Sequence, residues 1–243
     1  MNLTSHLEKV TEDIVSYIPD VNYDGIAVID WEYWSPVWEA ELFTYTKFYT
    51  SASIQMVQDR HPDWDRTLVE QVARIEFEQA AQSLFASTLR LATELRPKAL
   101  WGFYHFPYCY YSTAVGNCSQ LGMQVADRMK WLYAETPALY PSIYLKDSMD
   151  KGKRPAEYVQ SVLRQALEFR RNPWQPVLAY FRYKYTRSDL YLNLVCINLV
   201  PVESCQCLLR TALKASVLCL RLARNCTQWD SSPYSHLSLY VST

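Results

Sequence analysis

Gly25-Ile26-Ala27-Val28-Ile29-Asp30-Trp31-Glu32 is an apolar run that ends in two carboxylates. Its length and its β-branched residues predict a buried strand of a parallel sheet. Just before it, apolar residues repeat at helical spacing from Leu3 to Ile18, and Pro19 ends the pattern. A helix followed by a buried strand is typical of α/β folds.

The same alternation continues along the chain. Further strands are predicted at 100–104, 141–145 and 176–182, and further helices at 67–95, 121–133 and 155–170. This order indicates a parallel sheet with helices outside it. The chain has only 5 glycines, which excludes the Gly-rich phosphate-binding turns of Rossmann and P-loop proteins. We therefore predict an α/β fold of the (β/α) TIM-like barrel type, whose sites lie at the C-terminal ends of the strands.

The barrel is expected to be incomplete. A closed barrel has about eight strands, whereas four are predicted here, so it is short at both ends. The alternation stops after Arg187. We predict a partial barrel domain over 1–187 and a divergent, Cys-containing tail over 188–243. Within the tail we expect an apolar run at 193–201, a basic amphipathic helix at 208–222 and an exposed end at 229–243.

Composition narrows the functional class. The chain has 243 residues, 49% of them hydrophobic and 20% charged, which is typical of a globular protein. A net charge of −1 makes nucleic-acid binding through bulk charge unexpected. The sequence contains no run of about 18 apolar residues, so it predicts no membrane span. The chain is rich in aromatic residues, with 8 Trp, 19 Tyr and 8 Phe, which fits either a large core or an aromatic-lined sugar cleft.

Cysteines and glycosylation triplets favour an oxidising, secretory setting. There are 7 cysteines, an odd number, and N-x-S/T triplets begin at Asn2, Asn117 and Asn225. The first residues lack the apolar stretch of a signal peptide. We expect either that the signal lies outside this sequence or that the chain is an internal fragment beginning at Met1. The sequence does not indicate an oligomeric state.

The two carboxylates suggest acid–base chemistry. Residues i and i+2 of a strand point to the same side, so Asp30 and Glu32 should face one cleft while Trp31 faces away. Two neighbouring carboxylates do not both ionise freely, and one pKa rises. A protonated acid is what glycoside cleavage requires. The alternative is a pair of solvated acids at a strand end.

Several motifs in series then resemble the animal hyaluronidases, the glycoside hydrolases of sperm, lysosomes and venoms. The first is Val28-Ile29-Asp30-Trp31-Glu32-x-Trp34-x-Pro36-x-Trp38. It is followed by His61-Pro62-Asp63-Trp64, by Leu100-Trp101-Gly102-Phe103-Tyr104-x-Phe106-Pro107-x-Cys109, by Leu139-Tyr140-Pro141-Ser142-Ile143-Tyr144-Leu145 and by Pro176-Val177-Leu178-Ala179-Tyr180. The resemblance covers roughly residues 1 to 187.

The resemblance implies a reaction and a set of site residues. Hyaluronidases hydrolyse the β-1,4 link after N-acetylglucosamine in hyaluronan, and some also cleave chondroitin. Glu32 matches the proton donor, and Asp30 matches the residue that orients the substrate's acetamido group, which itself acts as nucleophile. Tyr104 and Tyr144 match tyrosines that contact the sugar, although they can also be read as tyrosines at the edge of the core. Neither a metal nor a cofactor is implied.

Three further residues are candidates. Arg182 is predicted at a strand end and could meet a substrate carboxylate, although a solvated arginine is the simpler interpretation. Cys109 and Cys118 fit a short disulfide of the family, beside Tyr104, and two free thiols are the alternative. The partner that we expect is hyaluronan or a related glycosaminoglycan.

Departures from the family pattern support a second hypothesis. Ser35 stands where the family has arginine, and Glu39 and Glu41 replace basic and aromatic groups, which a polyanionic substrate would disfavour. The family's first strands and a late strand have no counterpart, as though a segment were skipped near 194–202. The chain could therefore be a weak or inactive glycosaminoglycan-binding isoform. A third hypothesis, an unrelated acid–base enzyme on the same barrel, does not explain the tyrosine motifs.

Overall fold

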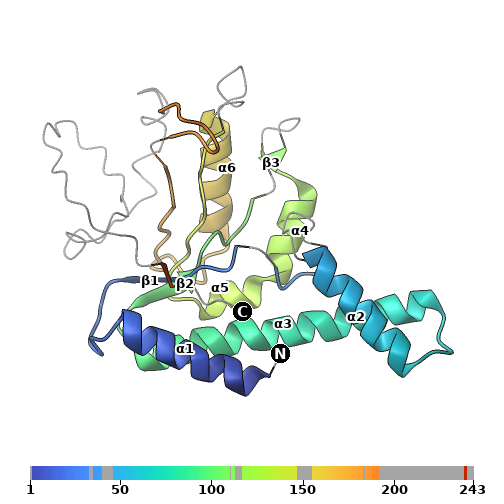
Figure 1. Cartoon of the computed structure of the whole chain (residues 1–243). Coiled ribbons are helices and arrows are strands. Elements are labelled where there is room, and N and C mark those ends of the chain that lie inside the picture. Colours follow the sequence, from blue (N-terminus) through green and yellow to red (C-terminus); the bar gives the residue numbers. More distant parts are fainter. Residues whose placement is uncertain are drawn as a thin grey trace, which may run out of the picture.

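The protein combines helices with a small parallel sheet (Figure 1). The structure is a computed structural model that describes residues 2–32, 35–39, 46–109, 111–112, 117–146, 155–182, 184–191 and 238–239. In chain order the elements are α1 (Leu3–Tyr17), β1 (Ile26–Ile29), α2 (Thr46–Arg60), α3 (Arg66–Leu95), β2 (Leu100–Phe103), β3 (Tyr111–Ser112), β4 (Asn117–Cys118), α4 (Gln120–Arg128), α5 (Lys130–Glu135), α6 (Pro155–Glu168) and β5 (Ser238–Leu239).

The sheet is parallel and open. β1 pairs with β2 from Ile26↔Leu100 to Ile29↔Phe103, and β5 pairs with the other edge of β1. Parallel bridges then continue beyond β2, at Tyr104↔Tyr140, Leu139↔Val177 and Ser142↔Tyr180. The segments therefore lie in the predicted order and direction. The prediction of full strands at 141–145 and 176–182 was nevertheless wrong, since both form isolated bridges. Each contains a proline, which has no N–H to donate to a ladder.

Of the tail, the structure describes Ser238 and Leu239, which form an additional strand beside β1 that was not predicted. The expected exposure of the end at 229–243 stays a prediction. The apolar run at 193–201 and the helix at 208–222 lie outside the described residues. The domain division after residue 187 stays a prediction.

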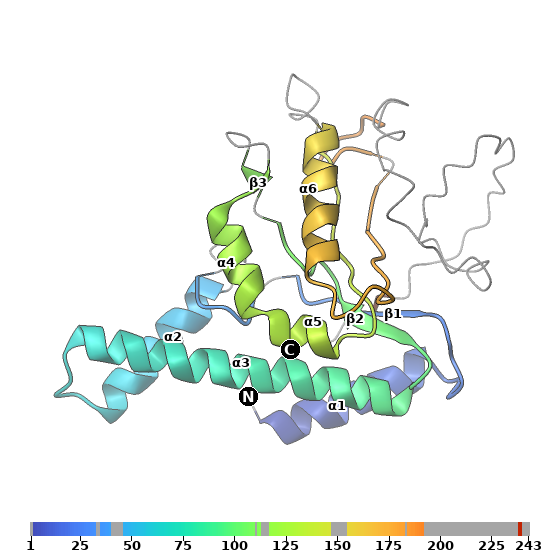
Figure 2. The same cartoon turned by 180° about the vertical axis from the view of Figure 1, so that it is seen from behind.

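The two faces of β1 have different environments. Ala27 and Ile29 point into a core formed with α1 and α3, which lie side by side below the sheet in both views (Figure 2). Val28 points the other way and packs with Tyr104 and Tyr140. Strand alternation thus separates a helix-facing core from an inner face, and the residues that follow β1 inherit these two sides.

The segment around Tyr140 packs closely against the inner face of the sheet because β2 contains a glycine there. A Cβ on Gly102 would stand 2.5 Å from the carbonyl oxygen of Ala138 and 2.6 Å from the ring of Tyr140. Tyr140 is fully buried and its hydroxyl donates to the carbonyl oxygen of Leu100. This tight packing brings the segment around Tyr140 against β2 and so fixes the neighbouring tyrosines.

Within the described part of the chain, the helices agree with the prediction except in two places. The helix at 67–95 is α3, which begins after Asp65, whose side chain caps the N–H groups of Thr67 and Leu68. α2 was not predicted, because among its residues only Thr46 and Val57 are buried and the apolar repeat is weak. The helix predicted at 121–133 is divided at the buried Met129 into α4 and α5.

Candidate functional site

Asp30 follows β1 on the inner face of the sheet. It is half-buried, and its Oδ1 atom is buried with no hydrogen-bond partner in the described part of the chain. Burial, and to a smaller extent the negative charge of Glu32, raises the pKa of Asp30 to about 6. A buried carboxylate oxygen without a hydrogen-bond partner is suited to accept a hydrogen bond from a ligand.

Glu32 lies two residues further on and is exposed. Its charge acts on Asp30 and on Tyr104, so it lies near both. The side chain between the acids, Trp31, is buried in the helix-facing core, 4.7 Å from the ring of Phe85 and 5.2 Å from that of Phe103. Trp31 thus faces away from Asp30 as predicted, whereas the placement of Glu32 in a shared cleft stays a prediction.

Three tyrosines form a wall beside the acids. The rings of Tyr104 and Tyr180 meet edge to face with centroids 4.9 Å apart, and those of Tyr104 and Tyr144 are 6.4 Å apart. Burial raises the pKa of Tyr104, and the neighbouring Tyr144 raises it further. The pKa of Tyr180 is raised by burial and then by the charge of Asp30. The phenols of Tyr104 and Tyr180 therefore stay neutral at physiological pH.

Tyr180 was not among the predicted site residues. It lies two positions before Arg182 in the segment predicted as the fourth strand, so strand periodicity would have placed both on the same side. Its nearness to Asp30 depends on the bridge between Ser142 and Tyr180.

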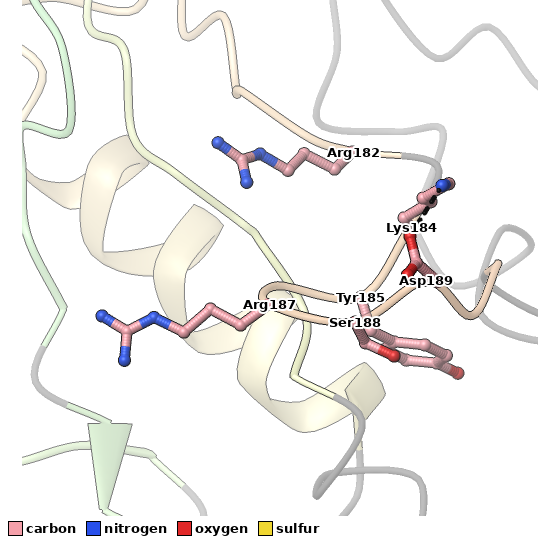
Figure 3. A pocket seen from close by; sticks show the side chains of 6 residues that line it. All are labelled: Arg182, Lys184, Tyr185, Arg187, Ser188 and Asp189. Carbon is pink, nitrogen blue, oxygen red and sulfur yellow. Dashed lines mark hydrogen bonds and ion pairs between the residues drawn. The ribbon is translucent and has the colours of Figure 1, made fainter.

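Arg182 extends the wall of tyrosines. Its guanidinium carbon lies 4.4 Å from the ring centre of Tyr144, a cation–π contact, while the residue as a whole is exposed. Arg182 also lines an open hollow of about 470 Å³ together with Lys184, Tyr185, Arg187, Ser188 and Asp189 (Figure 3). Arg182 is therefore exposed to solvent and held against Tyr144 of the tyrosine wall, and it lies between that wall and the basic residues of the hollow.

Covalent and aromatic contacts hold the loop that follows Tyr104. Cys109 and Cys118 form a disulfide with an S–S distance of 2.06 Å and a Cα–Cα distance of 5.3 Å, so the predicted pairing is confirmed. His105 has a positive φ of 76° and stacks on Tyr104 at 5.3 Å. Burial lowers the pKa of His105 to about 4, which keeps the ring uncharged beside the tyrosines.

The acidic departure at Glu39 has a structural explanation. Glu39 forms ion pairs with Arg74 of α3 and Arg128 of α4, and Arg128 also pairs with Glu78. Its charge is therefore matched rather than directed at a substrate, contrary to the expectation of repulsion. Ser35 is fully buried, and its hydroxyl accepts from the N–H of Val37. Glu41 lies outside the described residues.

The described residues show neither a metal site nor a membrane-spanning helix. Among them, no three His, Cys, Asp or Glu side chains gather in a way that could hold a metal ion. No helix in that part of the chain is both long and apolar enough to cross a membrane.

The geometry brings the sequence-predicted residues together. Asp30, Glu32, Tyr104, Tyr144 and Arg182 form one continuous group, to which the structure adds Tyr180. The group offers a half-buried acid, an exposed acid, three phenols and a guanidinium. Such a set can exchange protons with, and orient, a polar ligand with apolar ring faces. The role of each residue stays a prediction.

Comparisons with known proteins agree on one family. The sequence profile described as hyaluronidase matches residues 1–200. Hyaluronidase-1 of Mus musculus is 37% identical over 201 residues, which cover 79% of this chain and 43% of the relative. Hyaluronidase-2 of Rattus norvegicus is 36% identical over 203 residues, with the same coverage. The chain thus spans less than half the length of these curated relatives.

A solved structure gives the same result. Bee venom hyaluronidase in complex with a hyaluronic acid tetramer superimposes with a TM-score of 0.74 at 33% identity. The match covers 81% of this chain and 62% of the bee venom chain.

Proposed function

Because this chain belongs to the hyaluronidase family of glycoside hydrolases, we propose that it hydrolyses the β-1,4 links between N-acetylglucosamine and glucuronate in hyaluronan. The observation that carries this proposal is the pairing of the half-buried Asp30 with the exposed Glu32 beside a tyrosine wall. The bee venom protein, crystallised with a hyaluronic acid tetramer, supports the choice of substrate.

In the proposed reaction Glu32 is the proton donor. The Glu32 carboxyl gives its proton to the glycosidic oxygen as the bond from the anomeric carbon to that oxygen breaks. The carbonyl oxygen of the substrate's own acetamido group forms a bond to the anomeric carbon, which yields a cyclic cationic intermediate. Water then opens this ring, and the Glu32 carboxylate accepts the proton of that water. Its exposed position suits a group that exchanges protons with both substrate and solvent.

Asp30 is assigned a different task. In the proposal its buried Oδ1, which lacks a partner within the described residues, accepts a hydrogen bond from the acetamido N–H. That bond orients the acetamido oxygen, and the Asp30 charge stabilises the positive ring as it forms. Burial makes this charge costly in the free protein, and its pKa of about 6 reflects that cost. The interaction therefore strengthens as the reaction proceeds, as transition-state stabilisation requires.

The tyrosines and Arg182 are assigned to binding. Tyr104, Tyr144 and Tyr180 supply flat ring faces and hydroxyl groups for a sugar. Arg182 supplies a guanidinium for the glucuronate carboxylate. In this proposal the parallel segments from β5 to Tyr180 are one arc of a TIM-like barrel, and the disulfide accompanies passage through the secretory pathway.

Release of reducing ends from hyaluronan tests this function. The purified chain should generate new reducing ends that carry N-acetylglucosamine, and chondroitin is the second substrate to assay. Binding of hyaluronan without any release would favour the alternative of an inactive glycosaminoglycan-binding isoform. If the chain neither binds nor cleaves hyaluronan, the proposal is overturned.

A further inference from the structure

The hollow beside Arg182 is built by a short hairpin that is firmly anchored. Lys184 and Tyr191 form an antiparallel bridge, and the N–H of Tyr185 donates to the carbonyl oxygen of Leu190 at 3.0 Å. The N–H of Thr186 donates to the carbonyl oxygen of Leu145 at 2.8 Å. Tyr185 is only 4% exposed and belongs to the core cluster that contains the Cys109–Cys118 disulfide. The hairpin at 184–191 is therefore held to the scaffold and does not depend on a ligand for its shape.

Arg187 stands at the tip of this hairpin in an unusual conformation. Its φ is 59°, in the left-handed region that favours glycine, asparagine or aspartate over a long side chain. Such positions cost roughly 1 kcal/mol or more and are often found where a side chain must be presented in one direction. Arg187 is exposed, so packing in a core does not account for the residue type.

Charge in the hollow is arranged for an anion. Arg182 and Arg187 extend to the same side, whereas Lys184 points the other way and pairs with Asp189 at 3.2 Å (Figure 3). Among the described residues neither arginine forms an ion pair, while the carboxylate of the hollow is matched by Lys184. Two guanidiniums on one side of a hollow, with no ion pair among the described residues, are suited to bind carboxylates of a ligand.

We propose that the hairpin at 184–191 is a second carboxylate-binding subsite. In it Arg187 binds a uronate of the glycan that lies further along the glycan than the sugar unit bound by Arg182. This inference rests on the proposed function for the identity of the glycan, and it extends that function to a site away from the reacting bond. Continuity from Tyr144 through Arg182 to Arg187 gives a polyanionic chain a path along one face. The chemical class that fits is a glycan with regularly spaced carboxylates.

Calorimetric binding to the Glu32→Gln chain tests the subsite without turnover. Three ligands are compared: a hyaluronan octasaccharide, an uncharged chitin oligomer of the same length, and an oligoglucuronate that lacks acetamido groups. Arg187→Gln in this background should weaken hyaluronan and oligoglucuronate binding about 2- to 5-fold, the range expected for an exposed charge pair. Chitin oligomer binding should not change. The matched control is Arg66→Gln on α3, which removes the same charge from an exposed i,i+4 pair and should affect none of the three ligands.

Each outcome separates the subsite from the proposed function. If the Arg187→Gln and Arg66→Gln chains bind hyaluronan equally well while the wild-type chain hydrolyses it, the subsite alone is overturned. Oligoglucuronate binding that depends on Arg187, in a chain that does not bind hyaluronan, would keep the subsite and overturn the proposed substrate. Failure to bind either anionic glycan would overturn both. Thermal unfolding of each variant excludes a folding defect as the cause.

Discussion

Asp30 and Glu32 are two residues apart and close enough for their charges to interact, yet one carboxyl is half-buried and the other is exposed. The difference arises because β1 ends at Ile29, so Asp30 still shares the packed inner face while Glu32 lies beyond it. Equivalent side chains thereby acquire unequal environments, which is how a pair of carboxyls can divide two tasks between them.

Asp30→Asn should stabilise the chain at neutral pH. A pKa raised from about 3.9 in the unfolded chain to about 6 means that the folded state disfavours the ionised form. The stability that this carboxyl contributes when protonated is full below about pH 4 and is lost as the pH rises through 6. Asn carries no charge, so the variant should be more stable by about 1–2 kcal/mol at pH 7, after allowance for partial exposure, and nearly unchanged at pH 4.

Urea unfolding of both chains between pH 4 and pH 7 measures this difference. Glu32→Gln is the matched control, since it removes one charge from an exposed carboxyl and should change the neutral-pH stability far less. A loss of stability in Asp30→Asn at pH 7 would show that the ionised carboxylate is stabilised by the fold.

Removal of the disulfide should destabilise the loop beside Tyr104. The bond closes a segment with a sequence separation of 9, for which the chain-entropy relation gives about 2–3 kcal/mol. Replacement of both Cys109 and Cys118 by Ser should lower the free energy of unfolding by that amount, as urea denaturation would report. An unchanged unfolding midpoint in the double variant, under oxidising conditions for both proteins, would contradict this prediction.

Arg128→Met should loosen the segment at 35–39 from α3 and α4. Met keeps the apolar stem but leaves Glu39 and Glu78 with Arg74 as their common partner. Partly buried ion pairs of a network cost more to break than surface pairs, so we expect a loss of about 1–2 kcal/mol, against about 0.5 kcal/mol or less for Arg66→Met. Thermal unfolding at low and high salt distinguishes the two, and equal losses would contradict a role for the network.

Local patterns in the sequence were sufficient to predict much of the scaffold. The apolar run that became β1, the proline-bounded helices and the opposite orientation of Trp31 all follow from periodicity. The acids were found because a strand end with two carboxylates is unusual, and the tyrosines because they follow predicted strands. In each case the signal lies within a few residues.

Features that depend on distant contacts were not predictable in the same way. Tyr180 reaches Asp30 through bridges between segments far apart in the chain, and Glu39 is matched by arginines from two helices. The weak apolar repeat of α2 gave no periodic signal, because the helix buries little more than Val57 against α3. The pairing of Ser238 and Leu239 with β1 likewise joins the two ends of the sequence.

Hydrolysis of hyaluronan by the wild-type chain and by Glu32→Gln, assayed as release of reducing ends, tests the central claim most directly. The amide keeps the shape of the side chain but cannot give up a proton, so the rate should fall about 10²- to 10⁴-fold while hyaluronan binding is retained. Asp30→Asn, assayed alongside, should lose rate mainly in kcat, because its charge acts on the positive ring that forms during the reaction. Equal rates for the wild-type chain and Glu32→Gln would contradict the account and remove Glu32 from the reaction.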